Sequence, residues 1–265
     1  MFLAPLFKNS VLWKRTLLIL VAIAIPSFAH SGDEAEDIYI AEVMSIEGQV
    51  TAIKAGDSRE LKQGDFVGTG EVILVEGDGH VDMSLDAEWK NVVRINANTK
   101  VFLMSIFPTG FYLTYGDMAA KLDALPKNST FEIETPIALA AVRGSRYRVV
   151  HRDIVSGPES TVFNAHRSKV FLFPKVKGAL GEPAIVPENQ TSYVMKRAKT
   201  PSASREMVLV ELKENVLMFR AMDNQIKKMP SLGQIQTLAQ VEGEYSIALA
   251  KRLKVLKEKK QTQAK

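Results

Sequence analysis

The sequence predicts a mainly β protein that ends in a pair of helices, and two observations support this fold class. Between residues 38 and 195, short alternating or apolar runs are separated by Gly and Asp turn residues. After residue 204 the apolar spacing changes to three and four, which is typical of amphipathic helices. Many short strands at this spacing indicate a compact sandwich, barrel or solenoid-like β domain.

The first 29 residues have the pattern of a secretory signal peptide. A basic region is followed by an almost wholly apolar run over 16–25 and by small residues ahead of the predicted cleavage site. We expect cleavage between Ala29 and His30, because the apolar run is shorter than the ~20 residues that span a membrane. The alternative is an uncleaved membrane anchor. A short acidic linker, residues 30–37, would follow the signal.

Composition limits the chemistry that the chain can carry. The sequence has no cysteine, which excludes disulfides, thiolate metal sites and a thiol nucleophile, and which fits a bacterial periplasm. It has 34 basic and 30 acidic residues, and three of the basic residues belong to the signal. The tail, 251–265, carries seven basic residues and one glutamate. It could contact an acidic partner or anionic lipid, or it could be a solvated helix end.

The β domain is expected over 38–195, and a polar linker over 196–203. The expected strands are 72–75, 81–85, 92–95, 101–104, 111–115, 131–135, 147–150 and 192–195. Two helices, joined by a Pro/Gly break at 229–233, are expected over 204–265, with Ser204 as the first N-cap.

Each predicted helix carries an apolar stripe, and Asp223 interrupts the first one. The stripe residues are Leu209, Leu212, Val216, Phe219 and Ile226 in the first helix, and Leu238, Val241, Tyr245, Leu249, Leu253 and Leu256 in the second. Neither helix can bury its stripe unaided, so we expect an antiparallel hairpin, packed on itself or on the β domain. A homo-oligomer is the alternative; it would form through Leu209, Leu212, Val216, Phe219, Leu249 and Leu253.

The segment 131–150, FEIETPIALAAVRGSRYRVV, is the most distinctive part of the sequence. Phe131, Ile133 and Thr135 alternate with two glutamates, as in a half-buried strand. Pro136 ends that strand because it cannot donate a ladder hydrogen bond. Gly144 permits a backbone turn that a side chain would hinder. On the residues alone, this is a strand–turn–strand corner.

This corner resembles the signature of the FecR domain family, in Thr135-Pro136 and in Val142-Arg143-Gly144-Ser145. Other motifs resemble the family in its order, namely Val43…Gly48-Gln49-Val50, Leu61-x-x-Gly64-Asp65-x-Val67-Gly68-Thr69-Gly70, Val92–Val101 and Gly116-Asp117-Met118-Ala119-Ala120. The family's next turn contains a glycine that 162–170 lacks, so we expect that turn to be longer or built differently.

The resemblance implies a compact, solenoid-like β domain in which Arg143 braces the corner through backbone carbonyls, Glu132 or Glu134. The best-known members are periplasmic halves of regulators that relay receptor occupancy to a sigma factor. Because no cytoplasmic domain precedes the signal segment, we do not expect sigma-factor regulation by this chain alone. We expect a standalone module of the cell envelope instead.

The residues suggest no catalytic or cofactor site, and we expect no enzyme activity. The histidines are scattered at 30, 80, 151 and 166, and the carboxylates of 82, 86 and 88 read more simply as a solvated turn than as a glycosidase pair. Two functions remain: binding of an envelope protein, or binding of a glycan or cell-wall polymer. The candidate ligand contacts are Arg146, Arg148, Trp89 and Tyr112. Nucleic acid is not expected for an exported chain.

Overall fold

The structure, a computed structural model, describes residues 40–229 except 87, 107–108, 124, 126–128 and 156. The predicted signal peptide, its linker, the second helix and the basic tail lie outside the described residues. The described chain is mainly β and ends in one helix, α1 (Leu209–Lys228). The predicted mainly β class is therefore confirmed.

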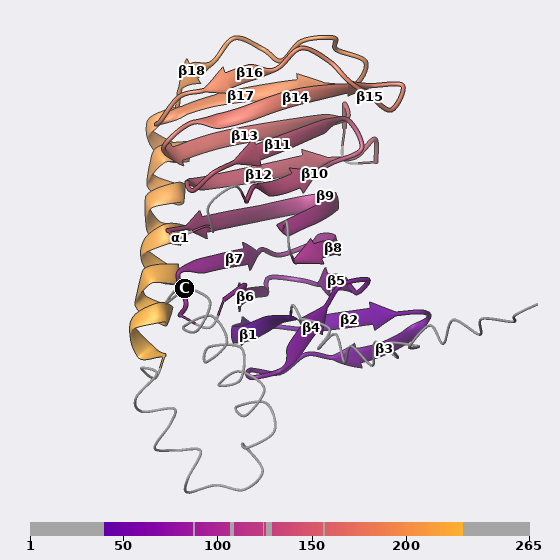
Figure 1. Ribbon diagram of the computed structural model, residues 1–265, viewed down its shortest axis with the longest axis vertical. Helices are drawn as coiled ribbons and strands as arrows, with labels where there is room; N and C mark the ends of the chain where they lie inside the picture. The colour runs from indigo at the N-terminus through magenta and orange to yellow at the C-terminus, as the bar shows by residue number, and fades with distance from the viewer. Residues whose placement is uncertain are drawn as a thin grey trace, which may run out of the picture. The chain divides into compact units, whose positions relative to one another are not determined.

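Two sheets share one long strand, β9 (Thr109–Leu122), and the chain passes repeatedly between them, as expected of a solenoid-like domain (Figure 1). Sheet A has the order β4-β1-β6-β7-β9-β12-β13-β17-β18. Its strands besides β9 are β4 (Phe66–Gly68), β1 (Ile40–Glu47), β6 (His80–Ser84), β7 (Asn91–Ile95), β12 (Arg146–Arg152), β13 (Ser160–Arg167), β17 (Gln190–Met195) and β18 (Arg205–Glu206).

Sheet B has the order β3-β2-β5-β8-β9-β10-β11-β14-β16, with β15 paired to the end of β14. The pairing of β9 with β10 is parallel and the other pairings are antiparallel. Its strands are β3 (Asp57–Glu60), β2 (Val50–Lys54), β5 (Val72–Val75), β8 (Thr99–Ile106), β10 (Phe131–Glu134), β11 (Ala138–Val142), β14 (Val170–Val176), β15 (Ala179–Leu180) and β16 (Ala184–Val186).

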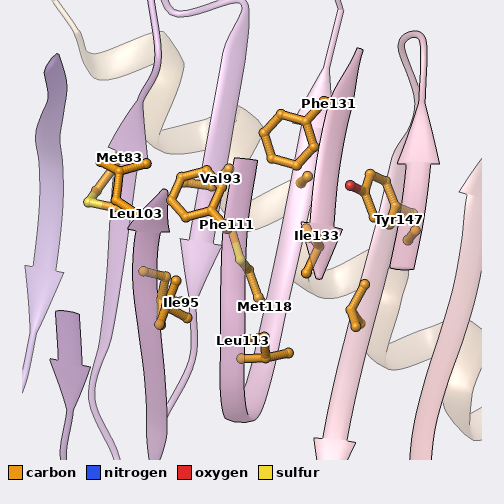
Figure 2. Close-up of a cluster of buried hydrophobic side chains, with 14 of the residues drawn as sticks. Met83, Val93, Ile95, Leu103, Phe111, Leu113, Met118, Phe131, Ile133 and Tyr147 are labelled. Carbon is orange, nitrogen blue, oxygen red and sulfur yellow. The ribbon is translucent and has the colours of Figure 1, made fainter. Parts of the chain in front are cut away.

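The hydrophobic core lies between the two sheets, because alternate residues of each strand point inward. Figure 2 shows its central part, where sheet A contributes Met118 and Tyr147, and sheet B contributes Phe111 and Phe131. The Phe131 ring lies 5.7 Å from that of Phe111 and meets Tyr147 edge to face at 6.2 Å. The predicted alternation of 131–135 is confirmed, since Phe131, Ile133 and Thr135 are all buried.

Strand β9 changes sheets at Gly116. The residues before it pair with β8 and β10 in sheet B, and those after it pair with β7 and β12 in sheet A. Gly116 has a φ of 108°, and a Cβ there would collide with Thr99. The Thr99 hydroxyl accepts a hydrogen bond from the Asp117 N–H at 2.9 Å. Position 116 therefore favours glycine where the chain crosses.

The sequence predicted that the first helix starts at residue 204, but α1 begins at Leu209. Ser204 does not cap a helix; its hydroxyl donates to the Ile185 carbonyl at 3.2 Å, and the next two residues add β18 to sheet A. The first turn is closed instead by Glu211. Its carboxylate accepts from the Val208 N–H at 3.0 Å and from both terminal nitrogens of Arg205 at 2.9 Å.

Of the two predicted alternatives for the turn between β13 and β14, the turn is built differently, without glycine, and it is not longer. Ser168 adopts the left-handed conformation, with a φ of 65°, that glycine would otherwise supply. Its N–H donates to the Glu188 carboxylate at 3.2 Å. A side-chain acceptor therefore stabilises a tight turn without glycine.

Candidate functional site

The two sheets have outer faces of different character, and this difference organises the candidate site. Helix α1 packs on the outer face of sheet A, where it contacts β1 and β13 (Figure 1). Among the described residues, no helix or strand packs over the outer face of sheet B. We call the first the helix-docking face and the second the open face.

An apolar cluster fixes α1 on the helix-docking face. The sheet side contributes Met44, Trp89, Val92 and Ala119, and the helix contributes Phe219 and Met222. All six side chains are buried. The backbone of Trp89 has a left-handed conformation, with a φ of 58°. The partly buried Met218, Ile226 and Met229 pack around them. Flexible methionine side chains fill the irregular space between a helix and a pleated sheet.

Cationic side chains of sheet A bind acidic and polar side chains of α1. Arg148 donates to Asp117 of its own sheet at 2.6 Å, to Glu214 at 3.1 Å and to Asn215 at 3.4 Å. Burial alone would lower the pKa of Arg148, but its hydrogen bonds to the carboxylates of Asp117 and Glu214 raise it above its usual range. The guanidinium thus stays charged and connects β12, β9 and α1.

A second ionic group lies further along the same helix. Arg146 donates to both oxygens of Asp223, at 3.0 and 3.3 Å, and Lys121 lies 3.6 Å from the same carboxylate. Lys121 also pairs with Asp123 of its own strand connection. Asp223 is therefore a docking residue, although in the sequence it appeared to interrupt the helix stripe.

The same face contains a buried ion pair between β6 and β7. Arg94 binds Asp82 through two hydrogen bonds of 2.6 Å each, and the Ser45 hydroxyl donates to the same carboxylate at 3.0 Å. Asp82 is fully buried. Of the predicted solvated turn, Asp86 does accept backbone N–H groups within its own turn, whereas Asp82 is buried in the ion pair with Arg94.

His166 of β13 stacks on Phe219, with ring centroids 5.1 Å apart and an interplanar angle of 13°. Burial and then the nearby charge of Arg146 lower the pKa of His166 below its ordinary value of 6.5. The neutral ring therefore suits this contact better than the charged ring does.

Three of the four predicted ligand contacts lie beneath α1. Trp89 is in the apolar cluster, and Arg146 and Arg148 make the ion pairs just described. This placement favours helix docking over ligand binding for these three residues. Tyr112, the fourth, lies in the sheet B part of β9, where the Lys175 ammonium is 5.9 Å from its ring centroid.

An apolar row crosses the open face of sheet B, with one residue from each of seven neighbouring strands. The residues paired in register from β2 to β14 are Ile53, Val72, Phe102, Tyr112, Glu134, Leu139 and Phe173. All are half-buried, and only Glu134, which is paired with Lys175, is charged. Beside this row, Phe171 and Ile185 are 44% and 48% exposed.

The predicted corner motif lies where the chain leaves sheet B for sheet A. Thr135 accepts the Ala138 N–H at 3.0 Å through its hydroxyl, which also contacts the Thr161 hydroxyl at 3.1 Å. The Thr161 hydroxyl in turn contacts Nδ1 of the buried His151 at 2.9 Å. Pro136 is exposed in the turn and Val142 is buried at the end of β11. Threonine hydroxyls thus link the two sheets inside the corner.

Arg143 does not brace this corner as predicted. Its side chain is exposed, and the described residues show no hydrogen bond or ion pair for it. Gly144 turns the chain with a φ of 106°, and the buried Ser145 donates its hydroxyl to the Arg167 carbonyl. Ser145 also exchanges backbone hydrogen bonds with Leu122 at 2.8 and 3.1 Å. The bracing is done by backbone groups and by hydroxyls, which are short enough to fit.

The predicted stripe of the first helix is rotated in the structure. Phe219 is buried against the sheet, but Leu209 is 64% exposed, and Leu212 and Val216 are half-buried. The inward side includes the polar residue Asn215, which is fully buried. The partner residues Leu249 and Leu253 of the predicted oligomer lie outside the described residues.

Within the part of the chain that the structure describes, no three His, Asp or Glu residues are grouped as metal ligands. The same part contains no helix long and apolar enough to cross a membrane. His30 lies outside it, and His80 faces Glu47 at 3.3 Å on the edge of sheet A.

No family model matches the chain, and no curated protein matches it either. Two crystal structures of a "putative anti-sigma factor" from Parabacteroides distasonis, at 1.65 and 2.50 Å resolution, are similar to it. Each shares 16% sequence identity with this chain, with a TM-score of 0.41. The similarity covers 51% of this chain and 59% of each of those chains, so it spans less than two thirds of their length.

Proposed function

We propose that this protein is an exported, non-enzymatic module of the cell envelope, and that a protein partner binds the open face of its β domain. One observation carries the proposal: the chain's own helix occupies the outer face of sheet A, whereas the outer face of sheet B carries the apolar row. Large apolar side chains gathered on one exposed face are typical of interaction surfaces.

The FecR-type assignment is part of this proposal, and the local roles of the motif residues support it. Gly116 and Gly144 sit at two points where the chain changes sheets, each with a positive φ. Thr135 and Ser145 supply the hydroxyls that hold the corner. These positions use a positive φ or a short hydroxyl side chain, which fits a motif with a structural role. A sensing role in the envelope is the function that such a domain suggests.

The chemistry of the open face favours a protein over a glycan. Aliphatic and phenylalanine side chains dominate the row, and sugars additionally require convergent polar groups for their hydroxyls. Within the apolar row, the charged residue Glu134 is already paired with Lys175. Tyr112 beside Lys175 is the specific feature that keeps a glycan, such as a cell-wall polymer, as the second candidate.

Photo-crosslinking in cells that produce the protein tests this proposal. Probes replace Tyr112 and Phe173 on the apolar row, and a matched probe replaces Val155, an apolar residue that is 89% exposed in the loop between β12 and β13. We expect one discrete protein adduct from both row positions and none from Val155. Adducts with wall polymer would support the glycan candidate instead. Equal labelling from all three positions, or none from the row, would contradict the proposal.

A further inference from the structure

We propose that the partner binds the open face through an amphipathic helix of about 20 residues, which crosses the strands of sheet B and carries a basic residue opposite Glu132. This inference rests on the proposed function, because it concerns the same face, and it names the kind of surface that the partner must offer. Three observations carry it: the direction of the apolar row, the way α1 lies on sheet A, and an acidic side chain without an ion pair.

The apolar row runs across the strands and not along one of them. It begins at Ile53 and ends at Phe173, six strand spacings away in the order β2-β5-β8-β9-β10-β11-β14. Neighbouring strands lie about 4.8 Å apart, so the row is about 29 Å long. A helix that follows the row would need about 19 residues. Its apolar side chains would recur about every 5.4 Å, which is close to the spacing of the row.

Helix α1 shows that a sheet of this domain accommodates a helix in that direction. It crosses the strands of sheet A between β13 and β1 (Figure 1). Its Glu214 binds Arg148 of β12, and Met222, two turns further along the helix, packs in one cluster with Met44 of β1. The 20 residues of α1 extend about 30 Å, which matches the length of the apolar row on sheet B.

A helix suits the open face better than an extended segment or a second sheet. Strand addition requires an unpaired strand edge, whereas every strand of the row is paired on both sides. An extended segment laid across the face would leave its backbone N–H and C=O groups against apolar side chains, at a cost in free energy. A partner sheet would also cover the charged side chains on both sides of the row, Lys100 and Glu132. A helix satisfies its own backbone and is narrow enough to follow one row.

Glu132 supplies the charge that the partner must match. It lies half-buried on the outward side of β10, and its carboxylate accepts a hydrogen bond from the Thr130 hydroxyl at 3.3 Å. Among the residues that the structure describes, Glu132 makes no ion pair, whereas Glu134 is paired with Lys175. Its neighbour in register on β11 is Ala141, whose short side chain leaves room for a long basic side chain. A carboxylate beside an apolar row thus favours lysine or arginine on the bound helix.

The same arrangement exists on sheet A with the charges reversed. There the sheet supplies the cations, and α1 supplies the carboxylates of Glu214 and Asp223 that bind them. Apolar side chains fix both helices on their sheets in this scheme, and charge selects which helix binds which face. The two faces therefore require helices of opposite charge.

Photo-crosslinks from three positions of the row test the helix. Probes replace Ile53, Tyr112 and Phe173 one at a time in the full-length protein in cells, and mass spectrometry identifies the linked residue of the partner. Successive probes are three strand spacings apart, or about 14 Å. A helix across the strands predicts linked residues about 9–10 positions apart within one continuous partner segment. An extended segment predicts about four positions.

We expect the spacing of about 9–10 positions from both pairs of probes. A spacing of about four, or linked residues in separate partner segments, would overturn the helix while the proposed function stands. Links only to a second copy of this chain would overturn it too, and would assign the face to self-association. The absence of any protein adduct from all three probes would contradict the proposed function itself.

Charge variants test the basic residue of the partner. Glu132→Lys and Glu132→Gln are compared with Glu76→Lys, a matched charge reversal in the exposed turn between β5 and β6. We expect the yield of the Tyr112 adduct to fall about tenfold in Glu132→Lys, to fall less in Glu132→Gln and to stay unchanged in Glu76→Lys. Circular dichroism checks that each variant is folded. Equal yields in Glu132→Lys and Glu76→Lys would overturn the basic residue opposite Glu132.

Discussion

The outer faces of the two sheets differ in their side-chain chemistry and in whether α1 covers them. The helix-docking face of sheet A carries methionine, tryptophan and cationic side chains, and α1 supplies the matching Phe219, Asp223 and Glu214. The open face of sheet B carries the apolar row, with one ion pair across it. On the face that the chain covers itself, these charged groups bind the helix. A face kept for another molecule can remain apolar, and this contrast suggests where a partner binds.

The largest expected effect of a single change is on the buried ion pair of sheet A. Asp82→Ala leaves the nearly buried Arg94 without its bidentate partner, so we expect a loss of about 3–5 kcal/mol in the free energy of unfolding. Glu134→Ala, in the more exposed pair of sheet B, is the matched control and should cost about 1 kcal/mol or less. Urea unfolding measures both. Equal losses would show that the two pairs do not differ as described.

The next comparison uses one phenylalanine from each region. Phe219→Ala removes a fully buried ring between α1 and sheet A and should cost about 3 kcal/mol. Phe171→Ala removes a half-exposed ring from the open face and should change stability by about 0.5 kcal/mol or less. Thermal unfolding and helix content by circular dichroism check both variants. A larger loss for Phe171 would mean that the open face is covered in the free protein.

The corner between the two sheets gives a smaller contrast. Thr135→Val keeps the shape but removes the hydroxyl that accepts the Ala138 N–H, so we expect a loss of about 1–3 kcal/mol. Arg143→Ala should cost about 0.5 kcal/mol or less, because the side chain is exposed. Chemical unfolding of the two variants measures which side chain contributes more to the stability of the corner. The reverse order would restore Arg143 as the residue that braces the corner.

The smallest effect concerns pH at the helix-docking face. Burial lowers the pKa of His166, and also the pKa values of His80 and His151, below the ordinary value of 6.5. The unfolded chain then binds more protons, so stability is fully present above pH 6.5 and falls as pH decreases from 6.5 toward the lowered values. His166→Gln should reduce the proton uptake on unfolding by up to about one.

Urea unfolding between pH 5 and 8 measures this uptake. Below that range, carboxylates titrate as well; the pKa of Glu211, for example, is lowered chiefly by its hydrogen bond from Arg205. If the free energy of unfolding of His166→Gln depended on pH as strongly as that of the unchanged protein, the inference that docking prefers the neutral ring would be contradicted.

The sequence predicted the β architecture and its corner well, because local rules decide them. Alternation places Phe131 and Ile133 inward, and the glycine at 144 marks a backbone turn that other residues would strain. The β-rich class could therefore be predicted without a homologue. How the turn at Ser168 is built without glycine could not be predicted, because a carboxylate from a distant residue, Glu188, stabilises it.

The candidate site was harder to predict, because it depends on which helix side meets the sheet. The apolar stripe predicted Leu209 and Leu212 as docking residues, whereas the docking side of α1 pairs with cationic residues on β9 and β12. The sequence did contain one indication of the docking side: Asp223 lies within the stripe, and Arg146 and Arg148 lie on the outward face of their strand. Trp89 was predicted to contact a ligand, whereas the structure buries it in the apolar cluster with Phe219 and Met222 of α1.

The central claim is that a protein partner binds the open face of sheet B. Its most direct test introduces one positive charge on the open face or on α1, while a photo-probe at Tyr112 reports contact with the partner. Phe171→Lys places a cation on the open face, and Leu217→Lys places one on the outward side of α1, where both side chains are exposed. We predict that the protein adduct at Tyr112 is lost in the first variant and retained in the second. Retention in Phe171→Lys together with loss in Leu217→Lys would contradict the assignment of the partner to sheet B.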